Sequence, residues 1–208
     1  ADIEWIAMGD TPTKRHIKIN GADPDKSWRF SPEHKPVAQL SQNMNFVMDL
    51  SAREFVMIHA ESRFVQNPEE KVELIIEKAN ELAGEKFDGD TPVTALSGGQ
   101  SRALMIADTA FLSKSPIVLI DEIENAGIDR KKALELLVGE EKIVLMSTHD
   151  PILALMGDKR LVIKNGGVHA IITTSDEERN NLEGLQELDM KLQDLRNRIR
   201  MGETLDTI

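Results

Sequence analysis

The sequence contains no cysteine among its 208 residues. Disulfide bonds and cysteine-based metal sites are therefore excluded as sources of stability or of chemistry. The absence fits a reducing compartment such as the cytoplasm, and equally any compartment in which the protein needs no disulfides. Hydrophobic residues still make up 40% of the chain. This is enough apolar mass for a folded core, in one domain or in one domain with a small subdomain.

Basic charge is also scarce. There are 25 Lys and Arg residues against 36 Asp and Glu residues, which gives a formal net charge of −11. An acidic surface repels phosphate backbones and anionic lipids, so nucleic acid is disfavoured as a partner. No apolar run approaches the ~20 residues of a membrane-spanning helix, and residues 1–8 carry acids where a signal peptide carries basic residues. We expect a cytoplasmic chain, either free or peripheral on the inner face of a membrane.

Two continuous apolar runs, at 117–120 and 143–146, are typical of strands that are buried on both faces. The pattern at 131–138 predicts a helix between them, which completes a β-α-β unit with a parallel sheet. A shorter strand-like piece lies at 37–40. Two strand-like pieces at 161–163 and 168–172, separated by Asn165-Gly166-Gly167, predict a hairpin. The core is therefore expected to be α/β.

Helical patterns fill much of the rest of the chain. Residues 43–85 are predicted to be mostly helical, with apolar residues at helical spacing over 69–83. Ser97 is placed to cap a helix that runs to about residue 112. Near the start, residues 2–8 indicate the end of a helix, and residues 16–20 alternate like a strand.

The tail from about residue 175 to residue 200 is charged and helical, with one apolar stripe. Its members recur at intervals of three and four: Leu185, Leu188, Leu192, Leu195 and Ile199. Such a stripe is typical of a helix packed on its own domain. The same spacing also forms a coiled-coil seam, so binding to a partner or a second copy is an alternative.

Three short motifs carry the residue types of a nucleotide site. Residues 96–100, Leu-Ser-Gly-Gly-Gln, lie at a loop-to-helix junction, where backbone N–H groups can face an anion. Asp121 and Glu122 end the first apolar strand, at the edge where open α/β sheets bind ligands. The first acid can hold Mg²⁺, and the second can orient or deprotonate a water molecule. His149 follows the second apolar strand, where it can contact a phosphate.

In this order and spacing, the three motifs closely resemble those of the ATP-binding-cassette (ABC) ATPase family. Residues 96–100 match the family's signature, 117–122 its Walker B strand with the following glutamate, and His149 its H-loop histidine. Residues 125–129, Asn-Ala-Gly-Ile-Asp, stand where the D-loop is expected. They differ from the commoner Ser-Ala-Leu-Asp but keep the aspartate, Asp129.

The resemblance extends upstream of the signature and covers roughly residues 1–170. Gln42 follows the strand at 37–40, as the Q-loop glutamine of the family does, and Gln39 is a possible rival. Residues 49–55 resemble the (Thr/Ser)-x-Arg-Glu-aromatic segment that follows the Q-loop in transporter-type cassettes, which favours Gln42.

The phosphate-binding pattern G-x-x-x-x-G-K-(S/T), the Walker A loop, is not present in the 208 residues. The resemblance places this loop immediately before Ala1. We therefore expect a missing N-terminal Walker A segment, which is truncated here, carried on a separate chain or otherwise interrupted. Without its lysine and its backbone cradle, the phosphates lose most of their electrostatic contacts. The prediction is that these 208 residues alone bind ATP poorly and do not hydrolyse it.

The resemblance implies a P-loop NTPase-like ABC cassette core with a mostly parallel sheet plus a helical subdomain. The expected division is 1–42 for the N-terminal part of the core, 43–113 for the helical subdomain, 114–174 for the rest of the core and 175–208 for the C-terminal helix. The cofactors implied are ATP and Mg²⁺. The partners implied are a second cassette, as a homodimer, and a transmembrane transporter subunit.

The resemblance also implies a role for each site residue. Glu122 and His149 are the predicted catalytic residues, and Gln42 and Asp121 attend Mg²⁺. The other nucleotide-binding or interface residues are Ser97, Gly98, Gly99, Gln100 and Asp129, with the signature residues acting on the nucleotide of the opposite subunit. The reaction implied is ATP hydrolysis coupled to closure of the dimer.

Three functions remain open at this stage. The compact helical subdomain and Arg53-Glu54 favour the ATP-binding subunit of a transporter. A soluble ABC ATPase that acts on a macromolecular assembly is the first alternative. A non-catalytic module that binds a partner through its C-terminal stripe is the second.

Overall fold

The computed structural model describes residues 2–31, 34–41, 46–123 and 127–204. The chain divides into two compact units, residues 1–147 and residues 148–208. The predicted four-part division, with boundaries after residues 42, 113 and 174, stays a prediction.

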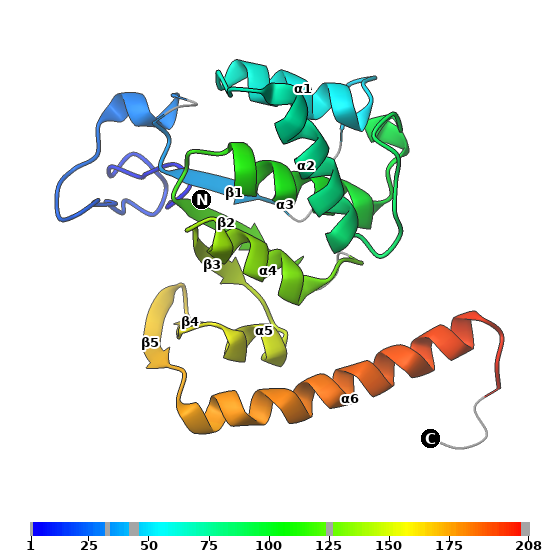
Figure 1. Cartoon of the computed structure of the whole chain (residues 1–208). Coiled ribbons are helices and arrows are strands. Elements are labelled where there is room, and N and C mark those ends of the chain that lie inside the picture. The colour runs from blue at the N-terminus through cyan, green and yellow to red at the C-terminus, as the bar shows by residue number, and fades with distance from the viewer. Residues whose placement is uncertain (1, 32–33, 42–45, 124–126, 205–208) are drawn as a thin grey trace. The chain divides into compact units, whose positions relative to one another are not determined.

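The first unit is built on a parallel sheet of three strands, in the order β1-β2-β3 (Figure 1). The strands are β1 (Val37–Leu40), β2 (Ile117–Asp121) and β3 (Ile143–Ser147). Ile117 lies opposite Val37 on one side and opposite Ile143 on the other. The α4 helix (Arg130–Gly139) connects β2 to β3, as the β-α-β pattern predicts.

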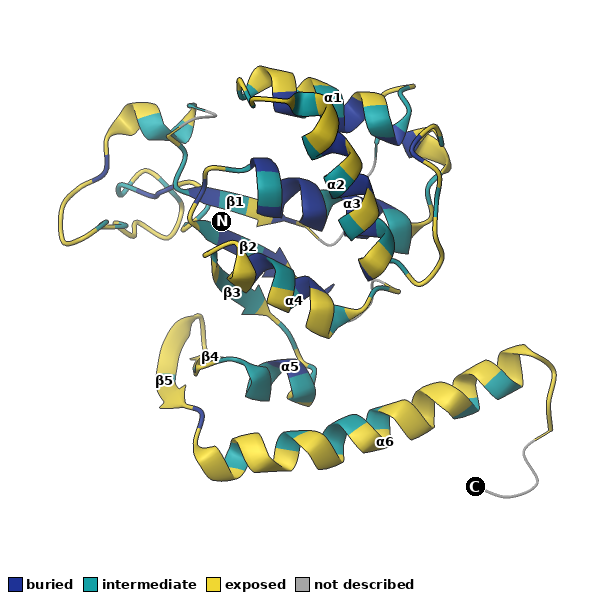
Figure 2. Cartoon of the chain, viewed as in Figure 1, coloured by how far each residue is buried: buried dark blue, intermediate teal, exposed yellow. Residues whose placement is uncertain are grey.

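Three further helices gather beside the sheet, namely α1 (Ala52–Ser62), α2 (Pro68–Leu82) and α3 (Gly98–Leu112). They pack mainly on one another, and α3 also contacts β1. The α3 helix is the most deeply buried: Figure 2 shows dark blue along it and along β2. The helix predicted over 69–83 is confirmed as α2, and the helix that Ser97 caps is confirmed as α3. Two 3-10 turns, η1 (Lys26–Arg29) and η2 (Val93–Ala95), lie in the connecting loops.

The second unit contains a short helix, a hairpin and a long helix. These are α5 (Pro151–Met156), β4 (Lys159–Lys164) paired antiparallel with β5 (Gly167–Thr173), and α6 (Asp176–Arg200). The hairpin turns at Asn165 and Gly166, which have φ values of +52° and +76°. Positive φ at both positions is the requirement of a two-residue hairpin turn. The predicted hairpin and the predicted C-terminal helix are therefore confirmed.

The α6 helix begins with a capping box between Ser175 and Glu178. Ion pairs from Arg160 to Glu178 and from Arg179 to Asp158 join the start of this helix to β4 and to the residue before it. None of the 25 residues of α6 is buried. Within its stripe, Leu188, Leu192 and Ile199 are exposed, whereas Leu185 and Leu195 are partly covered. Among the residues that the structure describes, no helix has the length and the apolar character that crossing a bilayer requires.

The N-terminal region differs from the sequence prediction. Residues 2–6 form turns rather than a helix end, and Met8 makes a single antiparallel bridge to His16. The Asp2 carboxylate accepts from Thr13 and Arg15, which closes a loop. A stretch this short cannot repay the cost of nucleating a helix by itself. The strand predicted at 16–20 is also wrong, because only isolated bridges occur there.

Candidate functional site

The carboxyl ends of β2 and β3 lie at one edge of the sheet, and the predicted acid pair begins there. Asp121, the last residue of β2, lies opposite Ser147, the last residue of β3. Asp121 is exposed, and the next acid, Glu122, is half-buried. Ends of adjacent parallel strands are where ligands bind in open α/β sheets. An accessible acid pair at this edge can therefore meet a charged ligand from solvent.

The backbone at Glu122 adopts an unusual conformation. Its φ is +48°, in the left-handed region that a residue with a Cβ rarely enters. Its N–H donates to the carbonyl oxygen of Ser147, with 3.1 Å between nitrogen and oxygen. The next residue, Ile123, is fully buried. The turn after β2 is thus fixed against the end of β3 and against the core, and it directs the chain out of the strand.

Ser97 begins α3 as its N-cap, with a complete capping box. The Gln100 N–H donates to Ser97 Oγ over 3.3 Å, and the Ser97 N–H donates to Gln100 Oε1 over 2.8 Å. The first N–H groups of a helix have no partner within the helix, and they carry partial positive charge. Ser97 and Gly98 are exposed at this tip. A Cβ on Gly98 would meet no atom within 4 Å, so the approach to the helix end is open.

Gln100 has a structural task in addition to its predicted role. Its Nε2 donates to the backbone carbonyls of Glu85 and Lys86, over 3.2 Å and 3.4 Å. The side chain therefore holds the loop that follows α2 against the start of α3. Sequence reasoning gave Gln100 a nucleotide-binding role only, and this contact between residues distant in sequence was missed.

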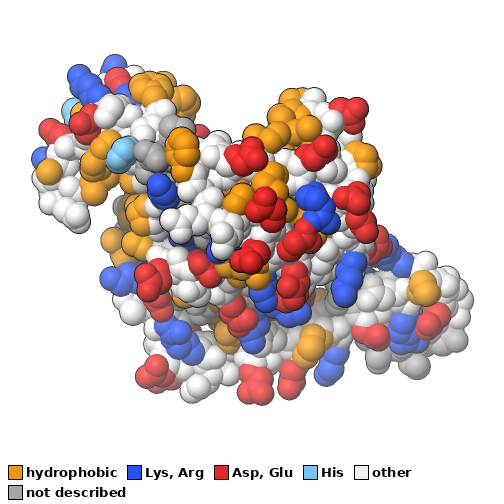
Figure 3. All heavy atoms as spheres, turned by 45° about the horizontal axis from the view of Figure 1, so that its top comes forward, with side chains coloured by type: hydrophobic (Ala, Val, Ile, Leu, Met, Phe, Trp, Pro, Cys, Tyr) orange, Lys and Arg blue, Asp and Glu red, His pale blue; other side chains and the backbone are white. Residues whose placement is uncertain are grey.

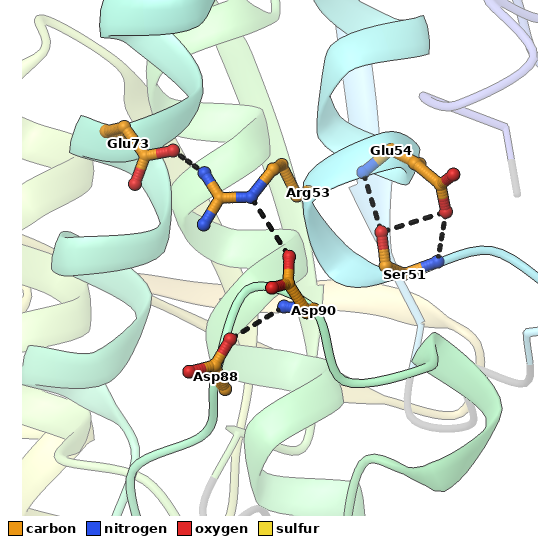
Figure 4. Close-up of polar contacts among 6 residues, drawn as sticks. All are labelled: Ser51, Arg53, Glu54, Glu73, Asp88 and Asp90. Atoms are coloured by element: carbon orange, nitrogen blue, oxygen red, sulfur yellow. Dashed lines mark hydrogen bonds and ion pairs between the residues drawn. The ribbon is translucent and has the colours of Figure 1, made fainter.

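Arg53 anchors the loop that leads into Ser97, as Figure 4 shows. It pairs with Glu73 of α2, and its Nε donates to Asp90 Oδ1 over 3.3 Å. The backbone N–H of Arg53 donates to the Gly89 carbonyl over 2.9 Å. A Cβ at Gly89 would lie 2.8 Å from Arg53 Nη2, so a larger residue there would have to displace the end of the arginine side chain. Arg53 therefore joins α1, α2 and the loop in front of α3.

The neighbouring Glu54 fixes the start of α1. It forms a capping box with Ser51, whose backbone and side chain both donate to the Glu54 carboxylate over 2.8 Å and 2.9 Å (Figure 4). These hydrogen bonds hold the pKa of Glu54 below its ordinary value, because they favour the charged carboxylate. The Arg-Glu pair of the sequence motif thus serves two local structural purposes.

Asp129 caps α4, because its Oδ1 accepts from the Lys132 N–H over 3.1 Å. Its own N–H donates to the Leu82 carbonyl at the end of α2 over 2.9 Å. The carboxylate therefore has a local structural task, and its predicted place at a dimer interface stays a prediction. Asn125 and Ala126, in the same motif, lie outside the described residues.

His149 lies in the second unit, where it is exposed. It is followed by Asp150, which caps α5 by accepting from the N–H groups of Ile152 and Leu153, over 2.7 Å and 3.3 Å. Asp150 also holds the chain locally, since its N–H donates to Thr148 Oγ1 over 3.0 Å. The histidine thus leads directly into a capped helix.

Gln42, the predicted Q-loop residue, lies outside the described residues. The strand that precedes it is present as β1, whose last residue, Leu40, lies opposite Ile120 of β2. The rival, Gln39, lies within β1, where its amide nitrogen can donate to the Glu4 carboxylate once the amide is turned. The glutamine that follows the strand therefore remains the better candidate for the sheet edge.

The donor set fits a magnesium ion that arrives with a nucleotide. Among the described residues, no three His, Asp or Glu side chains gather closely enough to form a complete metal cage. Magnesium is commonly held by one or two carboxylates together with water and substrate phosphates. One exposed carboxylate, Asp121, at the end of a strand matches that requirement.

Sequence reasoning also missed Arg102. This residue of α3 is buried, and its guanidinium contacts the backbone of Glu122. A basic side chain among the apolar residues of the helix, next to Ala103 and Leu104, was the signal in the sequence. The sequence could not predict the partner of Arg102, because Glu122 follows a different element, the β2 strand.

Two comparisons with known proteins point to one family. A family model described as ABC transporter matches residues 3–125. An uncharacterized ABC transporter ATP-binding protein of Methanocaldococcus jannaschii is 53% identical over 205 residues, which cover 99% of this chain and 78% of the relative.

Solved structures agree on the fold. The structure of an ATP-binding subunit of an ABC transporter has a TM-score of 0.59 at 22% identity, and the match covers 85% of this chain and 75% of that one. CbiO1 of Clostridium perfringens, part of the ABC transporter complex cbiONQ, has a TM-score of 0.58 at 19% identity, over 96% of this chain and 80% of that one. The predicted α/β cassette fold with a parallel sheet is therefore confirmed. The match to the M. jannaschii relative, which extends over nearly the whole chain, shows the family. This chain belongs to the ABC transporter family of ATP-binding proteins.

Proposed function

We propose that this chain binds and hydrolyses ATP as one cassette of a dimer that drives a membrane transporter. The observation that carries the proposal is the acid pair at the sheet edge. Asp121 ends β2 beside the end of β3, and Glu122 follows in a turn that is held to Ser147. Two adjacent carboxylates after a buried parallel strand suit a hydrolytic site for a phosphate ester.

Within this site the two acids have different tasks. Glu122 orients the attacking water and accepts its proton, as a general base does. Asp121 binds Mg²⁺, directly or through water, and Gln42 attends the same ion. The magnesium ion supplies charge neutralisation for the phosphate oxygens when it is bound. Phosphoryl transfer needs mainly positioning and electrostatic stabilisation, which these groups provide.

The tip of α3 acts on the nucleotide of the opposite cassette. Its capped end presents Ser97, Gly98 and Gly99, whose hydroxyl and N–H groups can bind a γ-phosphate, with Gln100 holding the tip in shape. His149 contacts the γ-phosphate from its place after β3, and Asp129 lines the interface of the dimer. ATP bound between two cassettes then favours closure, and its hydrolysis favours opening.

The transporter role rests on the family and on the relative's name. The M. jannaschii relative is named as an ABC transporter ATP-binding protein. We propose that the chain works in the cytoplasm, bound at the inner face of the membrane to a transmembrane partner. Co-purification with an integral membrane protein would support this role, and recovery only as a free dimer would favour a soluble ABC ATPase instead.

Replacement of Glu122 by Gln in the assembled ATPase, which includes the Walker A loop, tests the catalytic proposal. We expect kcat to fall by about a hundredfold or more, because a general base contributes at least about that much. ATP should still bind, so size-exclusion chromatography with MgATP should show an accumulated dimer. The matched control is Glu141→Gln, because Glu141 is an exposed glutamate that also has a positive φ of +57°. Hydrolysis at the normal rate by the Glu122→Gln protein would refute the proposal.

A further inference from the structure

Arg102 joins the signature helix to the acid pair within one chain. Its side chain is buried, with the residue only 6% exposed, and its Nη1 donates to the carbonyl oxygen of Glu122 over 2.9 Å. A guanidinium is always charged, and burying it is costly unless its N–H groups are hydrogen-bonded. An apolar residue at this buried position would avoid the cost of removing a charge from water. The hydrogen bond to Glu122 is therefore expected to have a function.

The contact falls on the most constrained backbone of the site. Glu122 has a φ of +48°, in the left-handed region that residues other than glycine rarely adopt. Its N–H is bonded to the carbonyl of Ser147, and its own carbonyl is bonded to Arg102. Both polar groups of this residue's backbone are therefore held, one by the end of β3 and the other by α3.

We propose that Arg102 is a positioning residue that keeps Glu122 in its left-handed conformation and so aims the carboxylate at the attacking water. The inference rests on the function proposed above. Release of the Glu122 carbonyl would let the peptide relax toward the right-handed region, which turns the Cα–Cβ bond in a new direction. Small displacements of a reacting group can lower a rate by about a hundredfold. In this role Arg102 acts through the backbone of Glu122 and does not touch the nucleotide.

The location of Arg102 gives this contact a second consequence. Ser97 caps the same helix, and its tip faces the nucleotide of the opposite cassette in the proposed dimer. A shift of α3 as that tip engages a phosphate would move Arg102 and, through it, the backbone of Glu122. The Glu122 backbone of one cassette would therefore respond when the Ser97 end of α3 in the same cassette binds the nucleotide of the opposite cassette.

The test uses the assembled ATPase with Arg102→Met, which keeps an unbranched apolar stem but removes the donor. We expect kcat to fall by about tenfold to a hundredfold, with the KM for ATP changed by less than about twofold. Arg102→Lys keeps a donor and is expected to lose less activity. The matched control is Arg63→Met, because Arg63 also donates from Nη1 to a backbone carbonyl, that of His59, over 3.1 Å at the end of α1. This control should retain normal kcat.

A double variant separates positioning from general damage. If Arg102 acts through the Glu122 carboxylate, then Arg102→Met should not lower kcat further in the Glu122→Gln protein, whereas independent effects would multiply. Amide hydrogen exchange should also become faster at Glu122 and Ile123 in Arg102→Met, with the rest of the sheet unchanged. Normal kcat in Arg102→Met, multiplicative losses, or unaltered exchange at these two amides would each overturn the inference.

The two proposals fail in different ways. Normal hydrolysis by the Glu122→Gln protein would remove the proposed function itself, whatever Arg102 does. An inactive Glu122→Gln protein together with a fully active Arg102→Met protein would leave that function standing and would remove only the positioning role. Should Arg102→Met not fold, the comparison of Arg102→Lys with the native protein, by kcat and by exchange at Glu122, decides the question.

Discussion

The N–H of Glu122 donates to the carbonyl oxygen of Ser147, and 3.1 Å separates the two atoms. This bond ties the residue after β2 to the last residue of β3, so the turn that carries the acid pair depends on the neighbouring strand. Parallel strands bring residues far apart in sequence to one edge, and this bond fixes how they meet there.

Ser97 is predicted to have two separable tasks. Ser97→Ala removes the cap of α3 and should lower the free energy of unfolding by about 1 kcal/mol. Ser97→Asp retains a good cap, so unfolding in urea should be close to that of the native protein. Its negative charge should nevertheless oppose a γ-phosphate and suppress ATP-dependent dimer formation. A stable Ser97→Asp protein that dimerises normally with MgATP would contradict the phosphate-binding role.

The core of the first unit is predicted to depend strongly on Leu104. This residue of α3 is fully buried, so Leu104→Ala should lower the free energy of unfolding by about 2–5 kcal/mol. The control is Leu192→Ala on α6, where the leucine is 53% exposed. Exposed positions away from special features usually change stability by less than about 0.5 kcal/mol. Denaturant unfolding measures the change in the free energy of unfolding for each variant. Equal losses of stability in Leu104→Ala and Leu192→Ala would contradict the burial pattern.

The loop before the signature is predicted to loosen when Arg53 is replaced. Arg53→Met removes its contacts with Glu73 and Asp90. All three side chains are partly exposed, so the loss of stability should be small, at about 0.5–1 kcal/mol. Amide exchange should become faster at residues 88–93, whose backbone pairs with the start of α1. Unchanged exchange in this loop would show that the backbone contacts alone hold it.

The start of α6 is predicted to weaken in acid. The hydrogen bond from Arg160, followed by that from the Ser175 backbone, lowers the pKa of Glu178 from its ordinary value of 4.5. A lowered folded-state pKa means that the stabilisation is fully present above 4.5 and is lost as the pH falls through the lowered value. Amide exchange at the first turn of α6, followed from about pH 6 to pH 3, should show this loss. Glu178→Gln should remove this pH dependence, and Glu183→Gln, on the same helix, should retain it.

Local patterns in the sequence predicted the elements that frame the site. The strands at 117–120 and 143–146, the helix between them and the cap at Ser97 depend on neighbours along the chain, and the structure confirms these elements. The predicted burial of the second strand on both faces is wrong, because no residue of β3 is buried and Ile143 is 61% exposed. The helix end predicted at residues 2–8 was wrong. The apolar spacing of these residues suits a helix, but the contacts of Asp2 with Thr13 and Arg15 close a turn instead.

Contacts between distant residues escaped prediction for a physical reason. Arg102 and Glu122 are separated by 20 positions, and their hydrogen bond exists only because folding brings Arg102 of α3 close to the residue that follows β2. The carbonyl bonds of Gln100 and the ion pairs of Arg53 have the same origin. A motif indicates which residue types are present, whereas the folded chain decides which backbone atoms they reach. The roles assigned to Glu122, His149 and the other site residues stay predictions for the experiments above.

The left-handed backbone at Glu122 has a consequence for protein engineering. Glycine and asparagine tolerate that conformation better than glutamate, so either one at position 122 should raise the melting temperature while removing the carboxylate. A library selected for heat resistance alone would thus lose the proposed general base through this one codon. Selection for a hardier enzyme from this scaffold must therefore reward turnover in every round.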